Sequence, residues 1–526
     1  MLTRRKVLVC LQLVVALHLI LGTTPAFGDS PTPENKVPGR VDSTARRLAN
    51  DFKQQGLEVT RGYFKLYTSK DCPMSYDVLG SCLGNNPAAP YVLPLVPPWP
   101  DEWVDPALIG AVGKTAKGYG GSFRLAQREA IVILGVMPPP ASYFGLQTYL
   151  FTRQGTYKTD SPQYRWVAAK VPYLLPVFFS TVPNNPARIQ LFASLSNSNN
   201  NVVIDGQSGA VWDQVRYFVI TPDQSMDAAV RGALSGIGVA AKDIFTEPIP
   251  GNLSLGIGES SDDFMMLMRY AMPEDGGAKR TPSDRWRNDL PLVVLRVRDA
   301  RTGAQPQPYP QVTLETRTAT NELGYQTDLD HIVAGVKARW EQPEATTKPA
   351  LNLQAQLHMV GPDCTKIGMN CLADTLDTAY QMSRRSPLDG DPQQVYAVAG
   401  ALGTETGNAT YVGLGLNNSL KLLGVGNVSG SQLRGSASGY SPGASDPDKF
   451  FVYYFTRDCR GLQELTGGYC FSVPKTMLPK CKDPADLTCE LLVFSLRDYI
   501  RPGTQRGPDA AQLLSPEVVM LHRPQK

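Results

Sequence analysis

The sequence predicts an α+β protein: a mixed α+β body in its N-terminal and central part, followed by a β-rich C-terminal domain stapled by disulfides. Three observations favour this class. A strand–helix–strand pattern occupies residues 215–249, five short strand-like stretches follow residue 393, and helices and strands do not alternate regularly. Because 526 residues exceed what one hydrophobic core organises, we expect two or more domains or one large α+β body.

Changes in composition along the chain suggest a division into segments. We expect a signal peptide at 1–28, a leader and short helix at 29–56, a mixed α+β domain at 57–343, a linker with the Cys364/Cys371 loop at 344–392, and a β-rich C-terminal domain at 393–526.

The first 28 residues have the pattern of a secretory signal peptide. Basic residues 4–6 precede an apolar segment, residues 7–22, and Ala26 and Gly28 occupy positions −3 and −1 of a cut before Asp29. An uncleaved membrane anchor and a twin-arginine export signal are the alternatives. We therefore expect a secreted protein, extracellular or in the lumen of the secretory pathway, with no stable membrane insertion after cleavage.

The charge balance argues against polyanionic partners. Removal of residues 4–6 lowers the number of basic residues from 51 to 48, which equals the 48 acidic residues. A net charge near zero gives no electrostatic reason to expect nucleic acid or an anionic membrane as a partner. A small molecule or a glycan remains open as a partner.

The cysteines predict disulfides rather than a metal site. Eight remain after the signal peptide, an even number, and they fall into four close couples: Cys72–Cys82, Cys364–Cys371, Cys459–Cys470 and Cys481–Cys489. A crossed pairing within the last four stays open. No couple has the short spacing of a zinc site, so we expect no metal and no cofactor.

The N-terminal elements begin with a leader, residues 29–38, rich in proline and polar residues. A short helix is expected over residues 43–56, with Ser43 as its cap and Gly56 as its stop. Residues 57–70 then follow a strand-like pattern toward the first cysteine couple.

Residues 215–249 form the clearest supersecondary unit. The strand "VRYFVI" meets a Pro-Asp turn, where Asp223 or Ser225 can cap the following helix. Apolar side chains recur at helical spacing up to Gly236 and Gly238, and an extended segment follows. The strands "RIQLFASL" and "LPLVVLRV" lie on either side of this β-α-β unit in the sequence.

The C-terminal part is expected to begin after one more helix. Residues 327–340 predict an amphipathic helix, and "EQPEATTKPALN" is typical of a linker. Five stretches separated by Gly, Asn and Ser then predict a sandwich or an antiparallel sheet: "QVYAVAGAL", "ATYVGLGLN", "LKLLGVGNV", "KFFVYYFTR" and "ELLVFSLRDY".

Two segments rich in proline and aromatic residues are candidates for a binding cleft. In residues 135–151 an apolar strand stops at three consecutive prolines, and residues 91–106 repeat the combination of prolines and rings. The candidate binding side chains are Tyr143, Phe144, Tyr149, Trp99 and Trp103. The alternative, which we favour, is that these rings pack the segments onto the protein as scaffold.

Acid–base chemistry, if the protein is an enzyme, is expected from carboxylates. Only three histidines follow the signal peptide, and the sequence has no G-x-S-x-G elbow. Asp374 and Asp377 lie three residues apart, which would place them on one face of a helix, and Glu405 lies at a Gly-rich turn. Capping, turn formation or solvation is the favoured alternative for each of them.

Four N-x-S/T sequons are candidate glycosylation sites: Asn252, Asn408, Asn417 and Asn427. The last three lie within twenty residues, which suggests an exposed face there if the host is a eukaryote.

The stretches "MPPPASYFGLQTYLF", "CLADTLDTAY" and "GTETGNATY" resemble segments of uncharacterised exported proteins of bacteria and simple eukaryotes, a resemblance that implies no activity. Two hypotheses for a secreted disulfide-containing protein therefore stay open. One is an enzyme that uses carboxylates on a small polar or glycan-like substrate. The other is a non-catalytic extracellular or wall-associated protein that binds a ligand in the same cleft.

Overall fold

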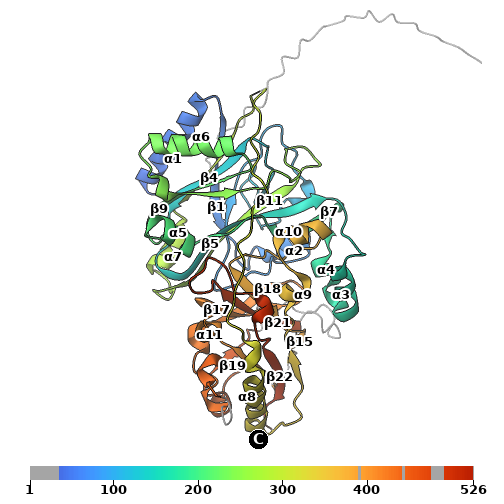
Figure 1. Ribbon diagram of the computed structural model, residues 1–526. Helices are drawn as coiled ribbons and strands as arrows, with labels where there is room; N and C mark the ends of the chain where they lie inside the picture. Colours follow the sequence, from blue (N-terminus) through green and yellow to red (C-terminus); the bar gives the residue numbers. More distant parts are fainter. Residues whose placement is uncertain (1–34, 302, 389–392, 441–444, 475–490, 525–526) are drawn as a thin grey trace, which may run out of the picture. The chain divides into compact units, whose positions relative to one another are not determined.

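A computed structural model describes residues 35–301, 303–388, 393–440, 445–474 and 491–524 (Figure 1). Helices make up 27% and strands 32% of the structure, in multiple mixed sheets, which confirms the α+β class. The expected signal peptide lies outside the described residues.

The N-terminal and central part is organised by one large sheet of 12 strands. The order of strands across it is β10-β9-β4-β12-β1-β2-β11-β5-β7-β6, with β3 paired to β11 and β8 to β5. The strands are β1 Glu58–Leu66, β2 Val92–Leu95, β3 Ser122–Phe123, β4 Glu129–Val136, β5 Ala141–Gln154, β6 Thr181–Val182, β7 Asn185–Ser194, β8 Asn199–Asn200, β9 Val215–Thr221, β10 Ile244–Pro248, β11 Asp263–Pro273 and β12 Leu292–Arg298.

β1 joins the two halves of this sheet. Its first half pairs with β12, with Gly62 opposite Val294, and its second half pairs with β2, with Tyr63 opposite Leu95. A Cβ atom on Gly62 would lie 2.1 Å from the backbone oxygen of Leu95. The change of partner therefore requires a residue without a side chain.

The β-α-β unit is confirmed. β9 and β10 pair in parallel, and α6 (Gln224–Gly236) connects them. Asp223 caps this helix by accepting a hydrogen bond from the backbone N–H of Met226, whereas the hydroxyl of Ser225 donates to Asp223. The apolar face of α6 packs on the sheet beside α1 (Gly39–Gln54), and the two helices lie next to each other in Figure 1.

α1 begins earlier than the sequence pattern indicates. It starts at Gly39, so Ser43 lies inside the helix and its hydroxyl donates to the backbone oxygen of Arg40 instead of capping. The end is as expected, since Gly56 follows with a φ of 79°. The start is displaced because residues 39–42 continue the apolar face through Val41, which is 2% exposed.

The proline run separates two strands that are not neighbours. β4 ends at Val136, and residues 137–140 carry the chain past four intervening strands to β5. The aromatic residues after the prolines lie on β5, where Tyr143, Phe144 and Tyr149 are at most 1% exposed. The rings therefore form part of the protein interior.

The C-terminal part is a sandwich of two sheets of five strands each. One sheet has the order β13-β22-β16-β19-β20 and the other β14-β21-β17-β18, with β15 paired to β21. The strands are β13 Thr347–Pro349, β14 Thr378–Met382, β15 Ser386–Pro387, β16 Gln394–Ala401, β17 Tyr411–Asn418, β18 Leu423–Ser429, β19 Phe450–Thr456, β20 Cys470–Ser472, β21 Leu491–Tyr499 and β22 Glu517–His522.

Alternating side chains of β19 serve two cores. Phe451 and Phe455 face the second sheet, where the rings of Phe455 and Phe494 lie 4.9 Å apart. Val452 and Tyr454 face the opposite way, toward α8 (Gln326–Arg339), whose adjoining Trp340 is 2% exposed. Burial on both faces explains why the sequence of β19 is an uninterrupted apolar and aromatic run.

The remaining α-helices are short. They are α2 Cys72–Leu79, α3 Pro162–Lys170, α4 Leu175–Phe178, α5 Asn201–Ser208, α7 Pro282–Asp289, α9 Leu353–Leu357, α10 Gly361–Ile367, α11 Gly403–Thr406, α12 Gly430–Leu433 and α13 Gln463–Thr466. Residues 344–388, in the segment expected to be a linker, thus contain strands and helices; the division into domains stays a prediction.

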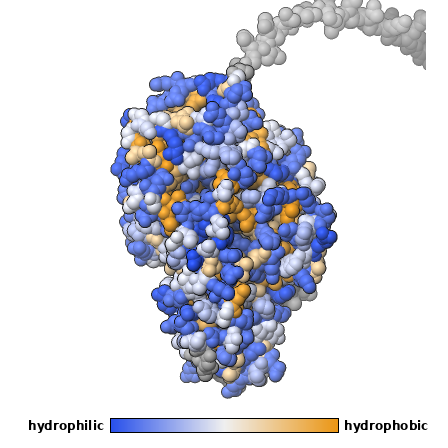
Figure 2. Space-filling view, viewed as in Figure 1, coloured by the Kyte–Doolittle hydropathy of each residue, from blue (hydrophilic) through white to orange (hydrophobic). Residues whose placement is uncertain are grey.

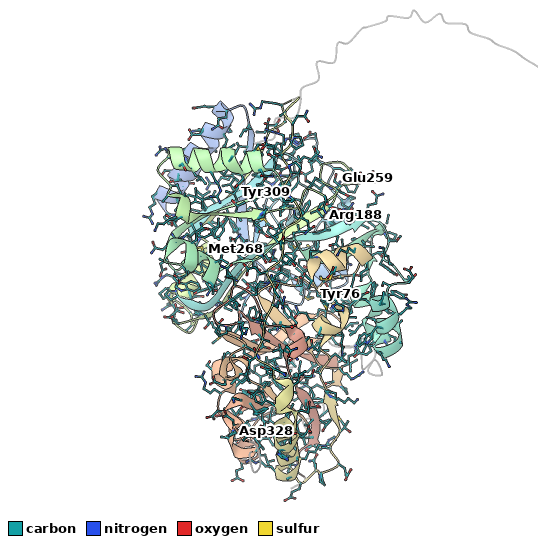
Figure 3. The ribbon with its side chains drawn as sticks, viewed as in Figure 1. Tyr76, Arg188, Glu259, Met268, Tyr309 and Asp328 are labelled. Carbon is teal, nitrogen blue, oxygen red and sulfur yellow. A yellow bond between two sulfur atoms is a disulfide. The ribbon has the colours of Figure 1, made fainter. Side chains whose placement is uncertain are left out.

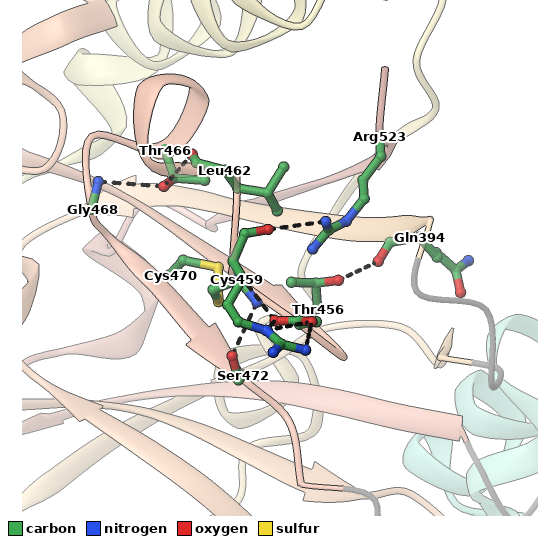
Figure 4. Close-up of a disulfide and its surroundings, with 11 residues drawn as sticks. Gln394, Thr456, Cys459, Leu462, Thr466, Gly468, Cys470, Ser472 and Arg523 are labelled. Atoms are coloured by element: carbon green, nitrogen blue, oxygen red, sulfur yellow. Dashed lines mark hydrogen bonds and ion pairs between the residues drawn. A yellow bond between two sulfur atoms is a disulfide. The ribbon is translucent and has the colours of Figure 1, made fainter. Parts of the chain in front are cut away.

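Three disulfides are present: Cys72–Cys82, Cys364–Cys371 and Cys459–Cys470. The expected Cys481–Cys489 couple lies outside the described residues. Cys459 follows β19 and Cys470 begins β20, so this bridge closes the loop that carries α13 (Figure 4). The backbone N–H of Cys459 also donates to the hydroxyl of Ser472, at 3.1 Å.

The face shown in Figure 2 is mostly hydrophilic, with apolar residues in small groups. Within the described ranges, no helix is both long and apolar enough to cross a membrane.

Candidate functional site

A cavity of about 110 Å³ lies between strands of the large sheet and strands of the C-terminal sandwich. That volume holds several water molecules or a small organic molecule. Most of the lining is apolar or aromatic; its aromatic residues are Tyr91, Phe151, Phe178, Phe192, Tyr380 and Tyr499. Arg269 on β11, Arg497 on β21 and Asp374 are its charged residues.

Strained backbone is concentrated around this cavity. Twelve described residues other than glycine have a positive φ, and five of them line it: Leu83, Phe192, Leu372, Ala373 and Leu422. Such conformations each cost about 1–3 kcal/mol and persist where surrounding contacts enforce them, which happens most often at functional sites. The concentration of strain favours this cavity as the candidate site.

One wall of the cavity is a loop fixed to β7, residues 370–374. The backbone N–H groups of Cys371 and Ala373 donate to carbonyl oxygens of β7, and the Cys364–Cys371 disulfide ties the loop to α10. α10 itself approaches β7 so closely that a Cβ on Gly361 would lie 1.8 Å from the Ser194 oxygen. The wall is therefore a rigid part of the protein.

Asp374 holds this loop in place. One carboxylate oxygen accepts from the backbone N–H of Ser194 at 2.9 Å, and the other accepts from the Ser194 hydroxyl at 2.6 Å and the Gly361 N–H at 3.1 Å. Burial raises the pKa of Asp374, which is 3% exposed. Three donors occupy its oxygens, so the geometry indicates a structural anchor.

Asp377 lies behind the cavity. Its carboxylate accepts hydrogen bonds from the hydroxyl of Tyr143, at 3.0 Å, and from the amide of Asn200, at 3.2 Å. Tyr143 in turn packs against Tyr499, with ring centroids 4.5 Å apart, and Tyr499 forms the cavity wall. Asp374 and Asp377 do not share a helical face, because the chain between them is an irregular loop leading into β14.

Arg269 is buried and forms no ion pair with a carboxylate of the described residues. Its guanidinium donates to the Tyr149 hydroxyl at 2.7 Å and to the backbone oxygen of Ala373 at 3.1 Å, and it lies over the ring of Tyr91. Only 4% of its surface is exposed. A guanidinium remains protonated in proteins, so this wall carries a full positive charge.

Arg497 has fewer hydrogen-bond partners than Arg269 among the described residues. It is 7% exposed and lines the cavity from β21, and its Nη1 has no hydrogen-bond partner among the described residues. No carboxylate in the described parts of the chain lies within ion-pairing distance of it. Burying a cation in this way costs free energy unless another group compensates it.

Two other buried arginines form ion pairs with carboxylates. Arg296 pairs with Glu129 and with Glu102, the latter at 2.6 Å. Arg188 pairs with Asp263 at 2.5 Å and donates to the backbone oxygen of Glu259 at 3.2 Å (Figure 3). Neither cavity arginine forms such an ion pair with the residues that the structure describes.

Several candidate residues lie away from the cavity. Glu405, on α11, forms an ion pair with Arg434, whose side chain is 62% exposed. Trp99 is 3% exposed and covered by Arg296 and Arg298, with the Arg298 guanidinium 4.5 Å from the ring. Trp103 lies against Arg124 at 4.5 Å.

The candidate rings of β5 are interior residues. Tyr143 and Tyr149 support the cavity from behind, through Asp377 and Arg269 respectively, and Phe144 belongs to the hydrophobic core. None of them lines the cavity directly. The cavity lies between sheets, and each of the two proline-rich segments contributes one ring to its lining, Tyr91 and Phe151.

The expectation of an exposed face around the clustered sequons is wrong. Asn408 is 0% exposed and its amide donates to Glu322 and Thr320, while Asn417 is 5% exposed. A glycan on either amide would have no space in the folded protein. Asn427 is half-buried and Asn252 is exposed.

Sequence reasoning missed both cavity arginines, although a signal was present. Each interrupts an apolar strand, in "FMMLMRY" and in "LLVFSLRDY". A charged side chain within a buried strand requires compensation, and this could have marked Arg269 and Arg497 as candidates.

Groups of three or more His, Cys, Asp or Glu suited to a metal ion do not occur in the described ranges. Neither a family model nor a curated protein matches the sequence. Among solved structures, an uncharacterised protein from Burkholderia cenocepacia is similar at 10% identity and a TM-score of 0.36, covering 92% of this chain and 87% of that chain. That level of likeness carries no inference about fold or function.

Proposed function

We propose that this protein is a non-catalytic, extracellular ligand-binding protein whose cavity holds a small organic molecule. The observation that carries the proposal is the enclosed, mostly aromatic and apolar cavity around which strained residues gather. Cavities of this kind, with a few placed polar groups, are typical of small-molecule sites.

Binding is favoured over acid–base catalysis by the positions of the three candidate carboxylates. Asp374 alone lines the cavity, and its oxygens already accept three hydrogen bonds. Asp377 lies behind Tyr143, and Glu405 is engaged by Arg434. A pair of carboxylates facing one substrate, which the enzyme hypothesis needs, is not formed by these residues.

An extracellular location is part of the proposal. Three intramolecular disulfides are compatible with an oxidising compartment, and the sequence pattern of residues 1–28 supports export. N-terminal sequencing of secreted protein should start within a few residues of Asp29; a membrane-bound product that retains Met1 would contradict export.

The binding proposal is tested by filling the cavity. Met359 is 9% exposed and lines it. Calorimetric titration of the full mature chain with benzoate, benzamide, butyrate and butyramide should give saturable binding of at least one probe. Met359→Trp should abolish that binding, because the indole occupies the space.

Met359→Leu is the matched control, since it conserves volume at the same position. It should bind as the wild type does, and circular dichroism should establish that both variants are folded. Equal binding by wild type and Met359→Trp, or no binding of any probe by the wild type, would refute the proposal.

A further inference from the structure

We infer that the ligand of this cavity is an organic anion, a carboxylate on a compact apolar or aromatic body, held by Arg269 and Arg497. This inference rests on the proposed function and specifies the class of ligand. The proposed function rests on the shape and apolar lining of the cavity, whereas the class of ligand is inferred from its charged residues.

The two arginines line the same cavity. Burial raises the pKa of both Tyr380 and Tyr499, and in each case Arg269 and Arg497 oppose that rise. Arg269 reaches the cavity from β11 and Arg497 from β21, and both line it together with Tyr380 and Tyr499. We expect an anion in this cavity to interact with both cations.

No described residue forms an ion pair with either of these cations. The raised pKa values keep Tyr380 and Tyr499 protonated, so the phenols are neutral at physiological pH. The remaining charged residue of the lining, Asp374, is held by Ser194 and Gly361 and forms no ion pair with either arginine among the described contacts. A net positive charge thus remains inside an enclosed space.

A carboxylate is the ligand group that fits this arrangement. The planar guanidinium presents paired N–H donors that match the two oxygens of a carboxylate, and such charge-assisted bonds are strong in a cavity that excludes water. The surrounding rings and aliphatic side chains offer apolar contact for the rest of the molecule. Neutral phenols can add hydrogen bonds to the same oxygens.

Arg497 is the better residue to change, because its side chain donates no hydrogen bond to the described residues. Arg269, in contrast, supports Ala373 and Tyr149. Arg497→Gln removes the positive charge, and Arg497→Lys keeps it. Arg434→Gln is the matched control, because it removes a positive charge from the surface, where Arg434 pairs with Glu405.

The experiment compares benzoate with benzamide, which share a shape and differ in charge, by calorimetry on the full mature chain. Wild type should bind benzoate at least about tenfold more tightly than benzamide. Arg497→Gln should weaken benzoate about 10- to 100-fold and leave benzamide nearly unchanged. Arg497→Lys should recover part of the loss, and Arg434→Gln should have no effect.

Inorganic phosphate serves as the competing anion without an apolar body. Weak competition by phosphate supports an organic carboxylate, whereas binding of phosphate more tightly than benzoate overturns that choice. Equal binding of benzamide and benzoate overturns the anion inference while the proposed binding function stands. Absence of all probe binding, by contrast, removes the proposed function itself.

Discussion

Glu247 is a buried carboxylate whose ionisation should make the free energy of unfolding depend on pH. It lies on β10 at 0% exposure and forms no ion pair with any cation of the described residues. One carboxylate oxygen accepts from the Thr148 N–H at 2.8 Å, the Gln147 amide at 3.1 Å and the Ser196 hydroxyl at 2.9 Å. The other accepts only from the Thr148 hydroxyl, at 2.8 Å.

Burial raises the pKa of Glu247 from 4.5 to about 7, against the opposing effect of these hydrogen bonds. Because the folded-state pKa is raised, the stability linked to this proton is fully present below pH 4.5 and is lost as the pH rises through 7. The difference between the two pKa values corresponds to about 3 kcal/mol.

Glu247→Gln should remove this dependence without disturbing the site. The amide oxygen can keep the three donors on one side, and the amide nitrogen can donate to the Thr148 hydroxyl, which rotates to accept. The variant should therefore match the wild type near pH 4.5 and exceed its free energy of unfolding by up to about 3 kcal/mol at pH 8.

Urea unfolding of both proteins at intervals between pH 4.5 and 8, with disulfides intact, measures the difference. Glu517, whose pKa is also raised to about 7, contributes to both proteins and cancels. Glu405→Gln is the control, since Glu405 lies in a surface ion pair. A constant difference between wild type and Glu247→Gln across this pH range would refute the reasoning.

Three further predictions concern the candidate site. Asp374→Asn should lower the free energy of unfolding by about 2–4 kcal/mol, because one of three buried donors loses its acceptor; an unchanged urea midpoint would contradict the anchoring role. Replacing Cys364 and Cys371 together by alanine should cost about 2.5 kcal/mol for a closed loop of this size, measured by the same unfolding assay, and should weaken binding of benzoate. Glu405→Gln should change stability by less than about 1 kcal/mol and leave binding intact; a large effect on binding would restore Glu405 as a site residue.

Much of the fold could be predicted from local patterns. The strand–turn–helix–strand order at residues 215–249 follows from apolar periodicity and the cap at Asp223, both of which act within a few residues. The couples Cys72–Cys82, Cys364–Cys371 and Cys459–Cys470 could be predicted for the same reason, since each closes a short loop. Structure that depends on residues close together in the sequence can therefore be predicted from the sequence.

The candidate site was set by contacts between distant segments. Arg269 and Arg497 are 228 positions apart in the printed sequence and face one cavity only because β11 and β21 belong to sheets that pack together. The sequence by itself determined that both strands are apolar and that each carries a single arginine. Only the tertiary structure decided that neither arginine meets a carboxylate of the described residues, because ion pairing depends on which side chains the packed sheets bring within a few ångströms.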